Sequence, residues 1–381
     1  METTTAQRTV SRRGEYEIVA SGPFRQERLR HANSYSTAMW FVRGKIDIVG
    51  DLVAAVRDQL ARAAPGWRQG VLNWVCRAAP WRIAELWESK TRSRRHIRFH
   101  YDRSNEFYRQ FLDSRMVYSC AYFRMAGESA RESLDEAQLA KLDHICRKLR
   151  LARGERFLDI GCGWGALALR AAATYGATAT GCTLSGQQAA HASACVRRDG
   201  LAGRVQILER DYRDMEGRFD KIASVGMFEH VGKLRLASYF RKVYDLLEPD
   251  GLFLNHGITR PSPVPPDPGS WFIARQVFPG GSIRTLPETI RAAEKAGFAV
   301  LDVESLRKHY ALTCREWVAR LRASREKCLR VVDERTWRTW QLFLAGSAVA
   351  FEDGCLDLHQ ILLAKRGSNR APAMTREYMY A

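Results

Sequence analysis

One segment constrains the fold more than any other, residues 157–173, which read FLDIGCGWGALALRAAA. An apolar strand-like piece runs into a glycine-rich turn, and a stretch of helical composition follows. Gly161, Gly163 and Gly165 let the backbone turn tightly and approach a ligand without a Cβ in the way. The order of strand, glycine turn and helix is the order that nucleotide chemistry requires, so a ligand site is expected at the end of this strand.

The sequence around this segment predicts a doubly wound α/β domain, because short apolar strands alternate with helical stretches from residue 156 onward. The last two strands lie close to the end of the chain, which predicts that an antiparallel strand closes the sheet. Two insertions, residues 259–285 and 308–340, stand where such folds build substrate pockets. The strands are expected at residues 156–160, 177–182, 205–209, 219–225, 251–258, 299–304 and 358–365.

The N-terminal third has a different character. Residues 1–30 are polar and Arg-rich and are interpreted as a leader, and residues 31–92 as a small N-terminal domain. Within it, an apolar strand-like piece meets Gly44, Ile46 and Ile48 alternate, and Asp51 opens a helix. Residues 93–366 form the predicted catalytic domain, and residues 367–381 a tail.

Residues 66–98 mix four tryptophans with seven arginines, and two interpretations stay open. One is a helical layer whose tryptophans are buried against the main domain. The other is an interfacial helix, because Trp prefers the headgroup zone and Arg prefers anionic phosphates.

Charge and cysteine content narrow the function classes. Lys and Arg number 60 against 42 Asp and Glu, a net charge of +18, which indicates attraction to a polyanion. Nucleic acid and an anionic lipid surface both qualify as that polyanion.

The nine cysteines form no CxxC pair and their number is odd, so reduced thiols are expected rather than a zinc or disulfide framework. The sequence has neither a secretory signal nor an apolar run of spanning length, which predicts a cytoplasmic protein.

The second strand end helps to identify the nucleotide. It reads GCTLSGQQ, with Thr183 and without the acidic residue that holds ribose hydroxyls in dinucleotide domains. LEPDGLFL, residues 247–254, stands at the right distance for the fifth strand of a class I methyltransferase. The composite therefore resembles the S-adenosylmethionine (SAM) fold. Ser185 and Gln188 also fit a capping box that would start this helix whatever the ligand.

Two further segments carry a specific resemblance: HYDRSNEFYRQFLDSRMVYSCAYF, residues 100–123, and RDYRDMEGRFDKIASVGMFEHVG, residues 210–232. With LDIGCGWG they resemble the cyclopropane-fatty-acyl-phospholipid synthases and the mycolic acid cyclopropane synthases, over residues 93–365. The resemblance implies transfer of the SAM methyl group to a cis double bond of an unsaturated phospholipid acyl chain. In that family a carbocation then loses a proton to a bound bicarbonate ion, and a cyclopropane ring closes.

The resemblance also implies site residues. Glu229 would orient the bicarbonate ion by accepting a hydrogen bond, and no metal is expected. Packing alone also accounts for Cys120 as a small buried residue, for Tyr310 as a core tyrosine, and for Trp164 as a wedge between helix and sheet. The implied bicarbonate-site residues are Cys120, Glu229, His256, Ile258 and Tyr310. The implied SAM-binding residues are Tyr118, Ser119, Asp159, Gly161, Gly163, Trp164, Gly165, Thr183, Leu184, Gln188, Asp211, Tyr212 and Arg213.

One position departs from the family. Ser347 stands where relatives commonly carry a cysteine that was long regarded as a nucleophile, and the chemistry above needs no thiolate. The stretch VRGKIDIVGDLVAAV is similar to the small lipid-binding domain of phospholipid-acting members. The expected partner is therefore an unsaturated phospholipid at an anionic membrane surface, contacted from the inner face, with a homodimer left open and no nucleic acid.

Four alternatives are considered. The cation could instead yield a methyl-branched or methylene product, or the enzyme could be a small-molecule N-methyltransferase, as plant relatives are. A nucleic-acid methyltransferase acting on exocyclic amines would show an (N/D)PP(Y/F) tetrad where this chain has GMFEH. A catalytically dead lipid-binding protein conflicts with the intact glycine turn.

Overall fold

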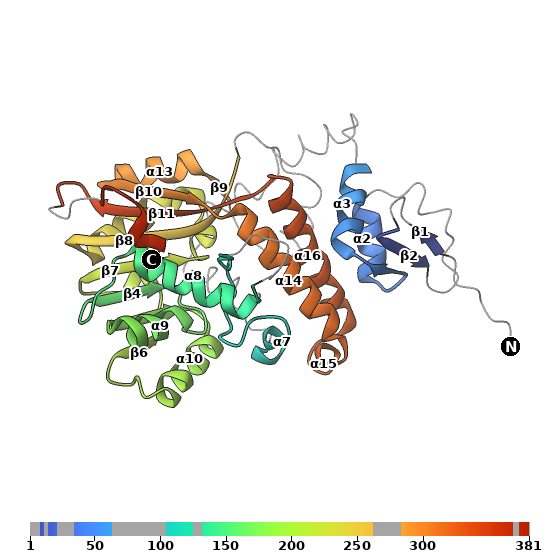
Figure 1. The fold of residues 1–381 in the computed structure, drawn as a ribbon, viewed down its shortest axis with the longest axis horizontal. Coiled ribbons are helices and arrows are strands. Elements are labelled where there is room, and N and C mark those ends of the chain that lie inside the picture. Colours follow the sequence, from blue (N-terminus) through green and yellow to red (C-terminus); the bar gives the residue numbers. More distant parts are fainter. Residues whose placement is uncertain are drawn as a thin grey trace.

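The computed structural model describes residues 8–10, 14–20, 34–62, 104–124, 132–261, 283–368 and 373–380. Within these ranges the main sheet has eight strands in the order β10-β11-β8-β7-β4-β5-β6, with the short β9 beside β8. β11 runs antiparallel to both of its neighbours, whereas β4 to β8 pair in parallel. The predicted doubly wound sheet with antiparallel closure is confirmed (Figure 1). The strands are β4 (Arg156–Ile160), β5 (Thr178–Thr183), β6 (Val205–Glu209), β7 (Phe219–Val225), β8 (Leu247–Arg260), β9 (Arg284–Thr285), β10 (Phe298–Ser305) and β11 (Asp357–Lys365).

Helices cover both faces of this sheet, and each face has its own buried core. One core joins α8 (Leu134–Lys148), α9 (Ala166–Tyr175) and α10 (Gly186–Arg198) to the sheet. The other joins α11 (Leu236–Leu246) and α13 (Leu286–Lys295) to the opposite face. Strand residues alternate between the two cores, as a sheet buried on both faces requires.

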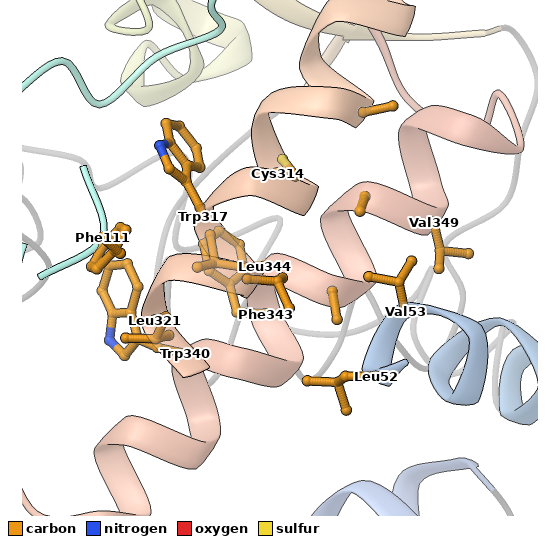
Figure 2. Close-up of a cluster of buried hydrophobic side chains, with 14 of the residues drawn as sticks. Leu52, Val53, Phe111, Cys314, Trp317, Leu321, Trp340, Phe343, Leu344 and Val349 are labelled. Atoms are coloured by element: carbon orange, nitrogen blue, oxygen red, sulfur yellow. The ribbon is translucent and has the colours of Figure 1, made fainter. Parts of the chain in front are cut away.

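A third core lies beside the carboxyl ends of the strands. It is formed by α7 (Asn105–Arg109), α14 (Arg307–Ala323), α15 (Arg325–Leu329) and α16 (Glu334–Glu352), so the insertion at 308–340 is helical. Figure 2 shows Trp317 and Trp340 among the buried side chains of this core. The centroids of their rings lie within 6.5 Å of that of Phe111, so the three rings pack together inside this core.

The N-terminal prediction needs two corrections. β1 (Arg8–Val10) and β2 (Tyr16–Ala20) lie in the segment interpreted as a leader, yet they pair with β3 (Ile46–Gly50) in a three-stranded sheet. The period-2 burial along β2 was the missed signal. The strand-like piece before Gly44 is the helix α2 (Ser34–Val42). The helix that Asp51 opens is confirmed as α3 (Leu52–Arg62).

This N-terminal unit packs on the helical layer rather than standing apart. Leu52 and Val53 share a core with Phe343 of α16 (Figure 2). The buried Arg338 guanidinium donates to the carbonyl oxygens of Phe41 at 3.3 Å and Ile46 at 3.2 Å, which fixes the unit to α16. The prediction for residues 66–98 lies outside the described residues, as does most of the insertion at 259–285.

The predicted tail contains one ordered turn, α17 (Glu377–Tyr380), that packs against α8. The carbonyl oxygen of Met379 lies 3.1 Å from Nδ1 of His144 and accepts a hydrogen bond from Arg147 Nε at 3.1 Å. None of the helices in the described ranges is long and apolar enough to cross a membrane. The same ranges hold no group of three or more His, Cys, Asp or Glu residues suited to a metal ion.

Candidate active site

One cavity lies at the carboxyl ends of β4, β5 and β7, where open α/β sheets bind ligands. The structure brings almost all of the predicted SAM-binding residues to its walls. Gly165 is the exception: a Cβ there would lie 2.8 Å from Cβ of Ala192, so this glycine serves the packing of α9 on α10. The predicted residues that line the cavity are Tyr118, Ser119, Asp159, Gly161, Gly163, Trp164, Thr183, Leu184, Gln188, Asp211, Tyr212 and Arg213.

The glycine turn is held in place by β5. The backbone N–H groups of Gly161 and Cys162 both donate to the carbonyl oxygen of Cys182, at 2.9 and 3.0 Å. Gly161 has a φ of 77°, and a Cβ there would lie 2.9 Å from the Met227 side chain. Position 161 thus has no room for a side chain, and the turn leads directly into the N-terminus of α9.

One of the two hydrogen bonds of the capping box predicted at Ser185 and Gln188 is present. Ser185 Oγ accepts a hydrogen bond from the backbone N–H of Gln188 at 3.4 Å, which caps α10. The Gln188 side chain nevertheless lines the cavity, where its Oε1 accepts a hydrogen bond from Thr183 Oγ1 at 2.8 Å. Trp164 likewise lines the cavity and also packs on Tyr108, with ring centroids 5.1 Å apart.

The Asp211 to Arg213 segment forms a rigid part of the wall. Asp211 is buried, and its carboxylate accepts hydrogen bonds from the backbone N–H of Arg213 at 3.0 Å and from its guanidinium at 2.6 and 2.8 Å. This carboxylate holds the pKa of Arg213 above its usual value. The Tyr212 ring packs edge-on against Tyr239, which orients it toward the cavity wall.

Two oppositely charged side chains line the cavity, Asp159 and Lys141, and the sequence predicted only Asp159. Asp159 is 2% exposed, and burial raises its pKa to about 7. Lys141 of α8 also lines the cavity, where Nζ donates to Ser119 Oγ at 2.9 Å and burial lowers its pKa to about 8. The available signal was spacing, because Lys141, His144 and Lys148 fall on the buried face of α8.

Glu229 lies in the short turn that follows β7. Its Oε1 accepts a hydrogen bond from the backbone N–H of Ile258 at 2.7 Å. Its Oε2 is buried and has no hydrogen-bond partner in the described part of the chain. Burial raises the pKa of this carboxyl to about 7. One oxygen is therefore fixed to β8, and the other is left for a donor from outside.

His256 lies on β8, two residues before Ile258, so both side chains project from the same face of the strand. Its Nδ1 lies 3.1 Å from Nε2 of Gln360, which stands opposite on β11. An amide donor at Nδ1 leaves the ring proton on Nε2, and Nε2 is buried with no partner among the described residues. Burial lowers the pKa of His256 far below its usual value, so the ring is neutral.

Cys120, Tyr310 and Ile258 belong to the third core, beside this pair. The Cys120 thiol donates to the carbonyl oxygen of Ala121 at 3.1 Å, and burial raises its pKa far above its usual value. It therefore stays a thiol and is no nucleophile. The Tyr310 ring stacks on Phe351 at 4.5 Å, as a core tyrosine does.

Ser347 is likewise not placed as a nucleophile. It lies on α16, and its hydroxyl donates to the carbonyl oxygen of Phe343 at 2.8 Å, within the same helix. No part of the arrangement around Glu229 and His256 depends on a thiolate at that position.

Comparison with known proteins gives consistent relatives. The family described as mycolic acid cyclopropane synthetase matches residues 88–361. A probable fatty acid methyltransferase of Pseudomonas putida is 42% identical over 363 residues, which cover 92% of this chain and 88% of that protein. The cyclopropane mycolic acid synthase MmaA2 of Mycobacterium tuberculosis is 36% identical over 282 residues, 71% of this chain and 96% of that protein.

Solved structures agree. The structure of MmaA2 matches with a TM-score of 0.68 at 34% identity, over 71% of this chain and 98% of that one. The mycolic acid cyclopropane synthase CmaA1, complexed with SAH (S-adenosylhomocysteine) and CTAB, matches with a TM-score of 0.67 at 34% identity and the same coverage. Coclaurine N-methyltransferase, at 24% identity and a TM-score of 0.69 over 87% of this chain and 99% of that one, shares the fold.

Proposed function

This chain belongs to the mycolic acid cyclopropane synthetase family, and from that premise we propose that it cyclopropanates unsaturated phospholipid acyl chains, with bicarbonate as the proton acceptor. That it is a SAM-dependent enzyme of the methyltransferase and cyclopropane synthase class follows from its relatives. The phospholipid and the bicarbonate ion are the proposed parts. SAM would supply the methyl group, and bicarbonate would take the proton.

The observation that carries the proposal is the pair of unmatched polar atoms beside β8. Within the part of the chain that the structure describes, Glu229 Oε2 is a buried acceptor without a donor, and His256 Nε2 is a buried donor without an acceptor. Such groups are costly to bury unless a ligand completes them. Bicarbonate has one O–H and two acceptor oxygens, so it can donate to Glu229 and accept from His256. Its fit therefore rests on hydrogen-bond complementarity.

The surrounding residues favour this chemistry. Glu229 and His256 are fixed through Ile258 and Gln360, so they can hold an anion without reorganising. The buried aromatic core around Trp317 keeps water away from the acyl chain and from any carbocation. A neutral His256 donates a hydrogen bond but does not release its proton, which leaves proton transfer to the bound anion.

The N-terminal unit favours a phospholipid substrate over a carrier-bound acyl chain. The fatty acid methyltransferase relative matches 92% of this chain, whereas the mycolic acid synthases match 71%. The extra length leaves room for a substrate-delivery unit, and the net charge of +18 suits an anionic bilayer. At about 1 kcal/mol for each basic residue near the surface, a few arginines would hold the enzyme reversibly on the inner face of the membrane.

The test uses SAM, bicarbonate and vesicles of an unsaturated anionic phospholipid. The expected product gains the mass of one CH₂ group for each reacted alkene and shows the upfield proton resonances of a cyclopropane ring. The reaction should stop in bicarbonate-free buffer and resume on addition of bicarbonate. Folded, SAH-binding protein that leaves the lipid unchanged would refute the phospholipid assignment.

A second candidate is favoured by one observation. The relative at 42% identity is named a probable fatty acid methyltransferase, and methylation without ring closure would give a methyl-branched or methylene product. When the cation loses a proton without closing the ring, the product keeps an alkene and gains the same CH₂, so mass alone does not separate it from a cyclopropane. Proton NMR does, because a methylene or methyl-branched lipid lacks the upfield ring signals.

A further inference from the structure

Lys141 is a buried cation with too few partners. It is 2% exposed, and among the described residues its one hydrogen bond is to the Ser119 hydroxyl, at 2.9 Å. No carboxylate within the described ranges lies close enough to form an ion pair with it. An ammonium group has three donors, so at least two remain for another ligand.

Lys148 shows what a buried lysine on the same helix face normally has. Its Nζ lies 2.5 Å from Glu304 and 3.4 Å from Asp302, so its charge is balanced within the protein. Lys141 lies two turns earlier and faces the cavity instead. Because a buried charge is costly without a counter-charge, a ligand is expected to supply one.

The neighbouring anion suggests which ligand. The Asp159 carboxylate also lines the cavity, and it makes no hydrogen bond within the described residues. The cavity thus offers a cation and an anion, close enough that each affects the other's titration but too far apart to form an ion pair. This is the complement of a zwitterionic α-amino acid, which is one end of SAM.

We propose that the Lys141 ammonium group binds the α-carboxylate of SAM, next to the Ser119 hydroxyl, with the α-ammonium group toward Asp159, which the sequence resemblance already assigns to SAM binding. The inference takes SAM as the ligand, which follows from the relatives, and it does not depend on the proposed phospholipid or bicarbonate ion. Gln138 supports it from one turn earlier on α8, because its Nε2 donates to the carbonyl oxygen of Ser119 at 2.8 Å. Helix α8 therefore holds Ser119 by both its hydroxyl and its carbonyl group.

The test compares two ligands on full-length protein by calorimetry. SAH carries the amino-acid end, and 5′-methylthioadenosine lacks it. Lys141→Met should weaken SAH binding by about ten- to a hundredfold, the range of a charge-assisted hydrogen bond, and should change binding of methylthioadenosine less than about twofold. Lys148→Met, the matched control, removes a buried lysine from the same face and should leave the ratio of the two affinities unchanged.

The pH dependence gives a readout that a structural role would not produce. Burial lowers the pKa of Lys141 to about 8, and the nearby Asp113, Cys120 and Asp159 oppose part of that shift. SAH affinity of the wild type should therefore fall more steeply above pH 8 than that of Lys141→Met, in which only the amino group of the ligand titrates. Methylthioadenosine binding should show no such fall.

The outcomes separate cleanly. Equal SAH affinity in wild type and Lys141→Met would overturn the inference, as would a parallel loss of both ligands. A variant that binds SAH normally but needs more bicarbonate for activity would also overturn it, by assigning Lys141 to the other anion. A wild type that binds neither ligand would contradict SAM as the ligand of this cavity, and would overturn the inference with it.

Discussion

Glu229 should lower the stability of the protein at neutral pH, and replacing it should raise that stability. Its carboxyl has an ordinary pKa of 4.5 and a folded-state pKa of about 7, because burial disfavours the charged form. The unfolded chain therefore loses this proton at a lower pH than the folded chain does. Stability contributed by the protonated form is complete below pH 4.5 and is lost as the pH rises to about 7.

The magnitude follows from the two pKa values. A rise from 4.5 to about 7 corresponds to about 3 kcal/mol, since each tenfold change in an equilibrium constant is worth about 1.4 kcal/mol. Glu229→Gln keeps an acceptor for the Ile258 N–H and carries no ionisable proton. The free energy of unfolding of the variant, relative to that of the wild type, should rise by about 3 kcal/mol between pH 4.5 and pH 8, while activity falls sharply.

Urea unfolding in bicarbonate-free buffer at several pH values measures this difference. A pH-independent cost of burying the amide would shift the difference in unfolding free energy by the same amount at every pH. The informative quantity is therefore how that difference changes with pH. Glu136→Gln is the control with the opposite sign, because hydrogen bonds from Ser133 hold the pKa of Glu136 below its usual value. A difference between Glu229→Gln and wild type that stays flat from pH 4.5 to pH 8 would refute the reasoning.

Three further substitutions test other parts of the structure. Ser347→Cys should change the methyl-transfer rate less than about twofold, because the hydroxyl only bonds to the carbonyl oxygen of Phe343; a large gain in rate would revive the thiol proposal. Gly161→Ala should weaken SAH binding at least about tenfold by calorimetry, because φ is 77° and its Cβ would contact Met227. Arg338→Met should destabilise the N-terminal unit by about 3 kcal/mol, seen as faster amide exchange in residues 34–50, because two buried carbonyl groups lose their donor.

The part of the fold that sequence predicts well is the part where local pattern and tertiary structure agree. β4, β6 and β7 have the predicted bounds, because each is a short apolar run between turn residues. β8 begins at Leu247, four residues before its predicted start, although the Pro-Asp-Gly sequence that follows Glu248 favours a turn. Pairing of Leu247 with Phe219 in the sheet outweighs that local preference.

The site shows the same limit in another form. The sequence motif locates Asp159 and the glycine turn, because these residues are consecutive in the chain and line the cavity together. Lys141 and Gln360 escape such reasoning, because their roles arise only when α8 and β11 are placed beside other elements. The helical spacing of Lys141 with His144 does show a buried polar face, but it does not show which polar group the lysine meets.

Four ionisable groups around the two sites share one property, which joins the two proposals. Burial shifts the pKa of Asp159 and Glu229 upward and that of Lys141 and His256 downward, so each shift favours the uncharged form. A site built in this way is cheaper to fold when empty, and it gains charge complementarity only as charged ligands enter. Ligand binding must then exchange protons with the buffer. Calorimetric titration of SAH at pH 8.5 in buffers of different ionisation enthalpy should show net proton uptake at Lys141, and Lys141→Met should lose that uptake.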